Sequence, residues 1–215
     1  MKHRVVLLLF VLTSSQPVHL AVAPFTSQAA QDAATPLDFV RAAGASLLLN
    51  GKPLQLFGVN HADLIYSFIW PRSIPENGTE ILEEAARYNI TIVRYSAIGY
   101  YAWQVRTWVE SKAIFWSGYD RLIETARELG IYLIPTLLWN PNQFPETVEE
   151  HRPDVFRTGT KSNGLFRAFV EELVSRYRDE TTILMWEIGN ELNLLVKPRT
   201  DYYSLEELRY LIKDM

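Results

Sequence analysis

The residues with the clearest capacity for chemistry are Asn190 and Glu191, which follow the mainly apolar run 183–188 after a single glycine. A run of this length and composition is typical of a buried strand. An α/β barrel places its reactive groups at the carboxyl ends of such strands. A carboxylic acid held there can donate a proton to a leaving group and later activate a water molecule. The pattern therefore identifies Glu191 as the candidate reactive group.

Polar or aromatic side chains follow three other apolar runs in the same way. They are Asn60, His61, Arg94, Trp139 and Asn140. Because the carboxyl ends of parallel strands meet at one edge of a sheet, these side chains are expected to lie near one another. Four such coincidences favour a common site more strongly than any one of them does.

Several of these residues also have purely structural interpretations. Glu191 is compatible with a surface carboxylate or with the N-cap of the next segment. Arg94 is compatible with a structural ion pair, and His61 with a turn residue. Glu187 lies inside its predicted strand, so burial beside Arg94 or another partner is expected of it rather than catalysis.

Strand and helix patterns alternate along most of the chain. Apolar runs predict strands at 91–95, 131–137 and 183–188. Apolar residues at helical spacing predict helices at 119–129 and 163–178. The alternation predicts parallel strands joined by helical crossovers.

Turn and cap signals complete the pattern. Asn50-Gly51 lies between apolar runs and predicts a hairpin whose second arm continues as far as Asn60. Thr79 is expected to cap a further helix. Ser204 and Glu207 match a capping box that opens the last helix.

The fold class that follows is α/β, either a barrel or an open doubly wound sheet. No G-x-G-x-x-G pattern follows a strand and no phosphate-binding loop is present, so a dinucleotide-binding sheet has little support. A (β/α)8 barrel, of which about the first four βα units are present, is the preferred interpretation. The last helix reaches Met215 without a Gly or Asn cap, so the domain is expected to be truncated there.

Composition excludes several classes of function. The net charge is −4 and no basic stripe is available to neutralise phosphates, so nucleic acid is not an expected partner. The chain has no cysteine, and its histidines have no metal-ligand spacing, so no metal or cofactor is expected. Aromatic residues make up 13% of the chain, which fits either core packing or a sugar-stacking cleft. Both interpretations are open for Trp70, Trp103, Trp108 and Trp116.

The N-terminal region has the character of a targeting segment. Residues 1–23 combine a basic start, an apolar run and a small-x-small cleavage site, which predicts a signal peptide and a secreted protein. Residues 24–44 are predicted to be a leader, and residues 45–215 the N-terminal half of a catalytic barrel. The apolar run is too short to cross a bilayer, so no integral membrane span is expected after signal cleavage.

Four segments together resemble one enzyme family. They are LLLNGKPLQLFGVN, NITIVRY, LLWN and WEIGNE, which occur in this order within residues 45–195. The chain resembles the N-terminal half of a glycoside hydrolase family 5 enzyme of the endo-β-mannanase and cellulase kind. The resemblance implies a retaining (β/α)8 barrel.

The resemblance also implies individual roles. Glu191 matches the general acid/base, and Asn190 the partner that hydrogen-bonds the sugar 2-hydroxyl. Arg94 matches the arginine that keeps the nucleophilic carboxylate ionised. Trp139 and Asn140 match substrate-side positions. The family's nucleophile is a Glu after the seventh strand, for which this chain offers no candidate.

The function implied is hydrolysis of a β-linked polysaccharide, of the mannan or cellulose type, by double displacement. Retaining enzymes hold their two carboxyl groups about 5–5.5 Å apart. Since only one of the two is expected here, the 215 residues by themselves are expected to be inactive. The alternatives are a catalytically inactive carbohydrate-binding protein and a half-barrel that self-associates to close its open sheet edges.

Overall fold

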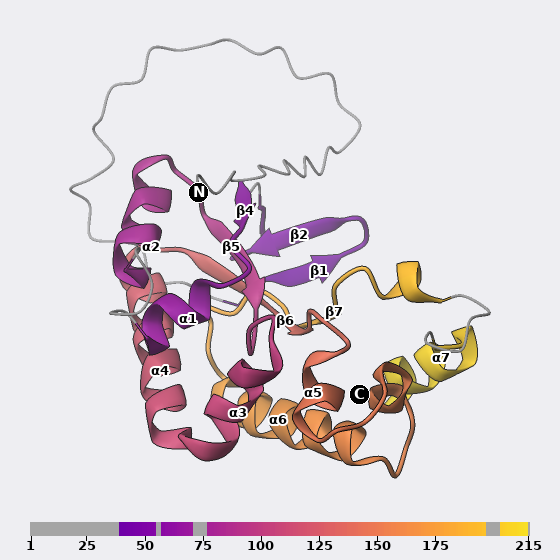
Figure 1. The fold of residues 1–215 in the computed structure, drawn as a ribbon. Coiled ribbons are helices and arrows are strands. Elements are labelled where there is room, and N and C mark those ends of the chain that lie inside the picture. Colours follow the sequence, from indigo (N-terminus) through magenta and orange to yellow (C-terminus); the bar gives the residue numbers. More distant parts are fainter. Residues whose placement is uncertain (1–38, 55–56, 71–76, 197–202, 215) are drawn as a thin grey trace.

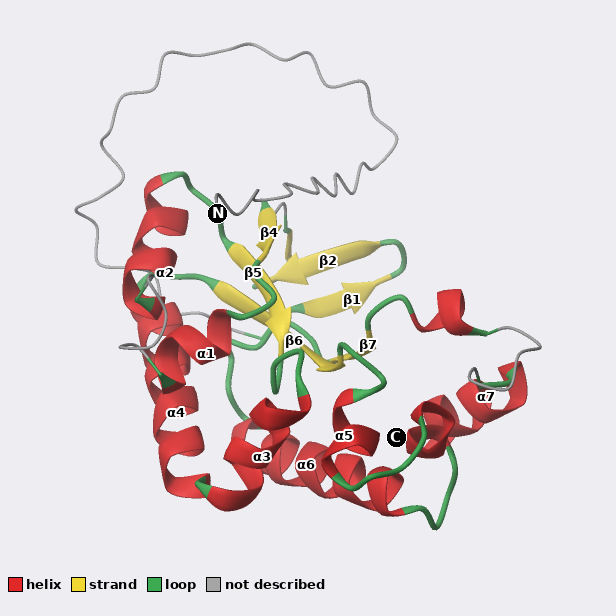
Figure 2. Cartoon of the chain, in the orientation of Figure 1, coloured by secondary structure: helices red, strands yellow, loops and turns green. Residues whose placement is uncertain are grey.

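The computed structural model describes residues 39–54, 57–70, 77–196 and 203–214. Within these ranges the strands form one parallel sheet and one small antiparallel sheet (Figure 1). Figure 2 shows helices α2 and α4 to the left of the parallel strands and α3, α5 and α6 below them, while the antiparallel hairpin extends to their right. The predicted signal peptide and most of the predicted leader lie outside the described residues.

The parallel sheet has the strand order β4-β5-β6-β7. Its strands are β4 (Gly58–Asn60), β5 (Ile92–Ser96), β6 (Tyr132–Leu138) and β7 (Glu187–Gly189). Strands that follow one another along the chain are neighbours, so the order never reverses as it does in a doubly wound sheet. The predicted α/β class with a parallel sheet is confirmed, and the sequential order favours the barrel.

The strand predicted at 183–188 is much shorter in the structure. Ile183 forms an isolated bridge to Leu133, and regular pairing resumes only at Glu187. Met185, between them, is 43% exposed. As the last strand of the described sheet, β7 pairs only with β6, which leaves the residues before it without a second neighbour to hold them extended.

The antiparallel sheet comes from the predicted hairpin. Asn50 and Gly51 have φ values of 51° and 76°, the left-handed conformation that such a turn requires. They join β2 (Ser46–Leu49) to β3 (Lys52–Pro53), and β1 (Arg41–Ala43) pairs with the other side of β2. The expectation of one arm continuing to Asn60 was wrong, since β4 belongs to the parallel sheet. Leu54, just after β3, still donates its backbone N–H to the Leu47 carbonyl at 2.8 Å, and residues 55 and 56 lie outside the described residues.

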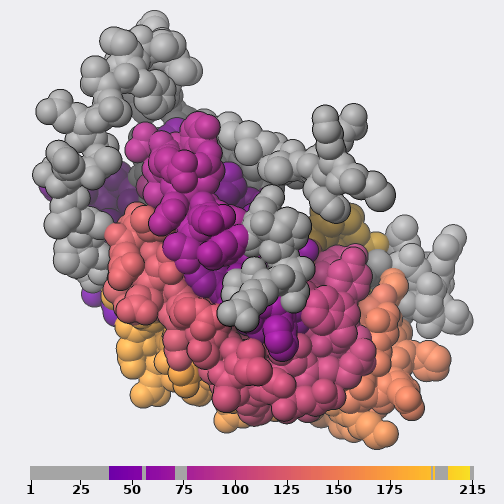
Figure 3. Space-filling view, turned by 60° about the vertical axis from the view of Figure 1, so that its left-hand side comes forward, coloured from indigo at the N-terminus to yellow at the C-terminus, as the bar shows by residue number. Residues whose placement is uncertain are grey.

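Helices cover each crossover. Among the described residues these are α1 (Leu64–Ile69), α2 (Gly78–Arg87), α3 (Ala102–Glu110), α4 (Lys112–Glu128), α5 (Gln143–Thr147) and α6 (Lys161–Tyr177). Helix α7 (Leu205–Asp214) follows the last strand, β7. Short 3-10 helices span Arg152–Phe156 (η1) and Leu192–Leu195 (η2). Helices α2 and α4 lie side by side on the face shown in Figure 3. No helix in the described ranges has both the length and the apolar character to cross a membrane.

Helix α4 begins at Lys112 rather than at the predicted Tyr119, and α3 ends immediately before it. Both helices pack on the core through tryptophans, since Trp108 is 3% and Trp116 is 9% exposed. The ring of Trp108 meets Phe169 of α6 edge-on at 5.4 Å. Core packing, rather than a sugar cleft, is therefore the role of Trp108 and Trp116.

The indole N–H groups of this core share one acceptor, Glu172 of α6. Trp116 donates to it at 2.9 Å and Trp108 at 3.2 Å, while the Lys112 ammonium lies 2.5 Å away. Burial alone would raise the pKa of Glu172, but the hydrogen bonds from Lys112 and Trp116 outweigh it and hold that pKa below its usual 4.5. The carboxylate thus joins α3 and α4 to α6 in its ionised form.

Helix α2 is capped by Asn77 and not by Thr79. The Asn77 side chain accepts a hydrogen bond from the Thr79 backbone N–H at 3.0 Å. The prediction of Thr79 as the cap was therefore wrong. The Asn77 backbone is extended, with φ −75° and ψ 134°, which is the conformation of an N-cap residue. The capping box at Ser204 is confirmed, with reciprocal bonds to Glu207 of 2.6 and 3.1 Å.

Replacing Asn77 with Ala is expected to lower the free energy of unfolding by about 1 kcal/mol, because a helix N–H loses its acceptor. Asn77→Asp keeps an acceptor oxygen and should retain most of the stability. Thr79→Ala should stay within about 0.5 kcal/mol of wild type. Urea unfolding of the three variants measures this, and a larger loss for Thr79→Ala than for Asn77→Ala would contradict the assignment.

Candidate active site

Arg94, in the middle of β5, connects three strands of the parallel sheet. Its Nε donates to Glu187 at 2.7 Å, its Nη1 to Asn60 at 3.2 Å and its Nη2 to Asn190 at 2.9 Å. These partners lie on β7, at the end of β4 and directly after β7. The guanidinium therefore fixes side chains that lie up to 96 positions from Arg94 in the sequence.

Strand register explains why these groups meet. Asn60 pairs with Arg94 across β4 and β5, and Thr136 pairs with Glu187 across β6 and β7. Thr136 also donates a hydrogen bond to the Glu187 carboxylate oxygen that Arg94 contacts. The expectation that Glu187 pairs with Arg94 inside the sheet is confirmed. Arg94 keeps 21% and Glu187 33% of the side chain exposed, so solvent partly screens the pair.

Trp139 joins the same group from the end of β6. Its ring centroid lies 4.5 Å from the Arg94 guanidinium carbon, which is a cation–π distance. The indole is half-buried. The structure thus brings together Asn60, Arg94, Trp139 and Asn190, all of which the sequence placed at strand ends, and adds Glu187.

Asn140 follows Trp139 in the sequence, but its side-chain amide forms hydrogen bonds with the backbone of two loops. Its Nδ2 donates to the Tyr100 carbonyl oxygen at 2.8 Å, and its Oδ1 accepts from the Asn142 backbone N–H at 3.1 Å. Both ends of the amide therefore hold backbone. The structure gives Asn140 a loop-fixing contact between the segment after β5 and the segment after β6.

His61 continues the β4 ladder before the chain turns into α1. Its backbone N–H donates to the Arg94 carbonyl at 2.9 Å, and its own carbonyl accepts from Leu64 at 3.1 Å. The residue is half-buried. These backbone contacts place His61 in a turn, as the structural interpretation of this residue expected.

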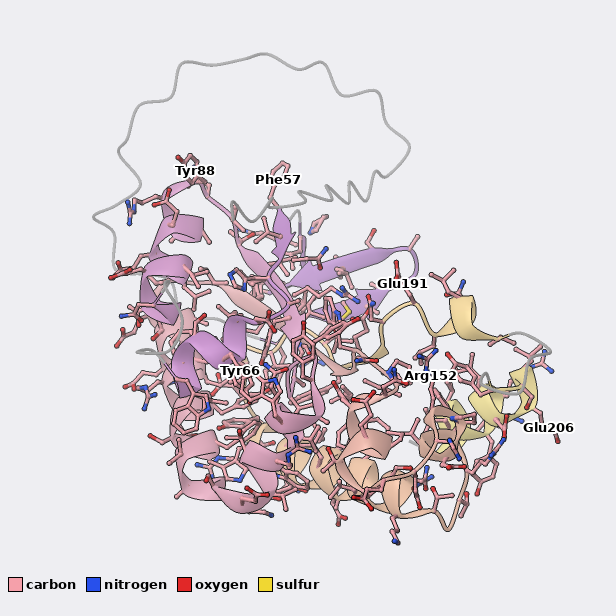
Figure 4. The ribbon with its side chains drawn as sticks, in the orientation of Figure 1. Phe57, Tyr66, Tyr88, Arg152, Glu191 and Glu206 are labelled. Carbon is pink, nitrogen blue, oxygen red and sulfur yellow. The ribbon has the colours of Figure 1, made fainter. Side chains whose placement is uncertain are left out.

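Glu191 has a left-handed backbone, with φ 50° and ψ 30°. A non-glycine residue pays about 1 kcal/mol for this conformation, and such residues gather at functional sites. Its side chain is exposed, and although it occupies the N-cap position of η2 it forms no cap hydrogen bond. In Figure 4 the Glu191 side chain projects from the loop that follows β7.

The chain around Glu191 is held on both sides. Asn190 donates its backbone N–H to Leu138 at 3.0 Å, and Leu194 donates to the Glu191 carbonyl at 2.9 Å. Leu192 is only 8% exposed and packs on Gly189. A Cβ added at Gly189 would lie 2.5 Å from the Cδ1 of Leu192. The backbone that carries the exposed carboxylate is therefore fixed, while the carboxylate itself faces solvent.

Sequence reasoning missed Thr136 as part of the site. It is the one threonine or serine within β6, and the other residues of that strand are apolar apart from Tyr132. A polar side chain in a buried strand needs a hydrogen-bond partner, and this requirement could have identified Thr136 from the sequence. Across the part of the chain that the structure describes, no group of three His, Cys, Asp or Glu side chains could hold a metal ion.

The chain is similar to plant mannan endo-1,4-β-mannosidases. No protein-family model matches it. It is 29% identical over 175 residues to mannan endo-1,4-β-mannosidase 5 of Solanum lycopersicum, covering 71% of this chain and 42% of the relative. It is 26% identical over 217 residues to mannan endo-1,4-β-mannosidase 2 of Oryza sativa subsp. japonica, covering 89% and 48%. The chain thus spans about half the length of the curated relatives it matches.

Solved structures show the same fold. An endo-1,4-β-mannanase from Rhizomucor miehei superposes with a TM-score of 0.58 at 18% identity, covering 82% of this chain and 56% of that one. A glycoside hydrolase family 5 mannosidase from the same organism, in complex with mannosyl-fructose, gives 0.61 at 14% identity, covering 81% and 53%. The parallel sheet and its helices therefore have the fold of part of the barrel of these two enzymes. The chain is related, over part of its length, to the endo-β-mannanases of glycoside hydrolase family 5.

Proposed function

We propose that the intact protein hydrolyses the β-1,4 bonds of a mannan by retaining double displacement. The observation that carries this proposal is the Arg94–Asn190 hydrogen bond, 2.9 Å long, beside an exposed Glu191 on a fixed backbone. The relatives named above act on mannan, which favours this polymer over cellulose.

Asn190 is proposed to bind the sugar 2-hydroxyl. Its Oδ1 accepts from Arg94, so its Nδ2 points away from the guanidinium and is free to donate to a hydroxyl oxygen. A hydrogen bond to the 2-hydroxyl that strengthens in the transition state contributes several kcal/mol in this class of reaction. Arg94 therefore acts through Asn190 as a positioning residue.

Arg94 also supplies positive charge where the mechanism needs it. The nucleophile must stay ionised, and an adjacent guanidinium favours the charged form of a carboxyl group. In this chain the Nε of Arg94 already donates to Glu187. Arg94 would therefore stabilise the ionised nucleophile through the positive charge of its guanidinium rather than through an Nε hydrogen bond. Trp139 and His61 are proposed substrate contacts at the same edge.

Glu191 is proposed as the general acid/base. In the first step it gives its proton to the glycosidic oxygen while the C1–O bond breaks and a nucleophilic carboxylate bonds to C1. In the second step the Glu191 carboxylate takes a proton from water, which attacks C1 and releases the nucleophile. We propose that β4 to β7 belong to the first four of eight βα units, and that the nucleophile comes from the other half of the barrel.

We propose that the protein is secreted, directed by the basic start, apolar run and small-x-small site of residues 1–23. The proposed hydrolysis relies on carboxyl groups for proton transfer and covalent catalysis, and on the amide of Asn190 and the guanidinium of Arg94 for positioning.

The intact gene product, incubated with β-1,4-mannan, is expected to release reducing ends and a series of manno-oligosaccharides. Cellulose serves as the comparison substrate and should be cut far more slowly. Retention of the protein on mannan without any release of sugar would instead support the carbohydrate-binding alternative.

A further inference from the structure

Three aromatic side chains are exposed where the chain passes from β5, the strand that carries Arg94, into α3. Tyr100 is 42%, Tyr101 54% and Trp103 48% exposed. We call these three residues the aromatic ledge. Exposed large apolar residues are ordinary when they are scattered, but a contiguous group is typical of a binding surface.

The backbone of the ledge is held by buried polar groups. Gln104, only 2% exposed, accepts hydrogen bonds at its Oε1 from the backbone N–H groups of both Tyr100 and Tyr101, the latter at 2.7 Å. The Ser96 hydroxyl exchanges hydrogen bonds with the backbone of Gly99, whose φ is 98°. An added Cβ at Gly99 would lie 2.3 Å from the Gln104 amide carbon. The turn is therefore fixed in the conformation that presents the aromatic rings.

The rings are also braced by neighbours. Tyr100 and Tyr101 meet edge-on with their centroids 5.0 Å apart. Trp103 meets Tyr66 edge-on at 4.7 Å, and Tyr66 is 2% exposed with its hydroxyl against Thr107. Rings that are already oriented lose little conformational freedom when a ligand binds.

The ledge adjoins the candidate active site. The Tyr100 carbonyl accepts the hydrogen bond from Asn140, whose sequence neighbour Trp139 stacks on Arg94. A chain of contacts thus runs from Arg94 through Trp139 and Asn140 to the ledge. The Asn140 amide thus joins the segment after β6 to the segment after β5, which carries the ledge.

We propose that the aromatic ledge binds sugar units of the same mannan chain that are remote from the bond being cut. This rests on the proposed function. The flat apolar faces of tyrosine and tryptophan match the C–H faces of pyranose rings, and a polymer that occupies the active site continues beyond it. A short substrate cannot reach the ledge, whereas a long chain can.

The test compares long and short substrates in the intact protein. Tyr100→Ala/Tyr101→Ala is expected to raise KM on mannan, and to weaken mannan binding, by about tenfold through the loss of two stacking rings. The kcat on mannan and both constants on an aryl mannobioside should change less than twofold, because binding that is equal in ground and transition states affects KM alone. Trp103→Ala should act in the same direction.

Two controls separate stacking from other effects. Tyr100→Phe/Tyr101→Phe keeps the rings and should behave as wild type, whereas loss of affinity in this variant would show that the hydroxyls and not the ring faces bind. Tyr88→Ala removes a tyrosine that is 71% exposed and that lies far from Tyr66 in Figure 4, and it should change nothing. Thermal unfolding checks that each variant is folded.

Binding of mannan, measured by affinity electrophoresis, keeps this proposal distinct from the proposed function. If the wild type binds mannan without cutting it and the alanine variant loses that binding, the ledge is supported although the hydrolase proposal fails. If mannan is cut and the alanine variant is unchanged in KM and binding, the ledge is overturned and the hydrolase proposal stands. Absence of mannan binding by the wild type also overturns the ledge.

Discussion

Replacing Glu191 with Gln in the intact protein is expected to lower kcat on mannan about a thousandfold, within the range that general acid–base catalysis contributes. The substitution keeps the size of the side chain and removes its proton-donating carboxyl. The Glu191 side chain is exposed and forms no cap hydrogen bond, so unfolding by urea should be unchanged.

The leaving group of the substrate identifies the role more closely. An aryl mannoside with a strongly acidic phenol needs no proton to depart, so the first step should recover much of its rate in Glu191→Gln. Added azide, which attacks without a general base, should then speed the second step. Glu124→Gln changes an exposed glutamate on α4 and serves as the matched control. Wild-type rates in Glu191→Gln would overturn the assignment.

Replacing Arg94 with Met is expected to lower the free energy of unfolding by about 2 kcal/mol and to reduce kcat on mannan strongly. Removing one partner of a fully buried pair costs about 3–5 kcal/mol, and partial exposure of Arg94 and Glu187 reduces this figure. The loss leaves Glu187 without its cation, and Asn60 and Asn190 without their common donor.

A double-mutant cycle measures the contribution of the pair. If Glu187 and Arg94 stabilise each other, Arg94→Met combined with Glu187→Gln should cost less than the sum of the two single changes. Arg87→Met is the control, because Arg87 pairs with Glu84 at 2.9 Å while both side chains are more than half exposed. That change should cost about 0.5 kcal/mol or less. Additive effects at Arg94 and Glu187 would contradict the account.

The active-site edge could be predicted from the sequence because parallel strands align their ends. Asn60, Arg94, Trp139 and Asn190 each follow or end an apolar run, and strand register then brings them together. The pairing of Glu187 with Arg94 was predictable on the same basis, since a charge inside a buried strand needs an opposite charge.

Other features depended on contacts that no local pattern contains. The cap of α2 is Asn77 rather than Thr79. The extended backbone at Asn77 directs its side chain toward the backbone N–H of Thr79 in the first turn of the helix. Trp108 of α3 and Trp116 of α4 are buried, and Glu172, on another helix, accepts hydrogen bonds from both indoles. Such long-range partners override local propensity.

The aromatic ledge was also hidden in the sequence. Tyr100, Tyr101 and Trp103 could equally have packed inside, and composition alone left both possibilities open. Their exposure follows from the buried Gln104 amide, which holds the turn, and from Gly99, whose positive φ a larger residue would rarely adopt. The exposed position of Glu191 follows in the same way from a left-handed backbone at a non-glycine residue.

The most direct test of the central claim follows the anomeric configuration of the new reducing ends by proton NMR as the intact protein cuts mannan. Double displacement predicts that the β-anomer forms first and that the α-anomer grows in only by mutarotation. Initial formation of the α-anomer, or no new reducing ends at all, would contradict the retaining mechanism proposed around Glu191.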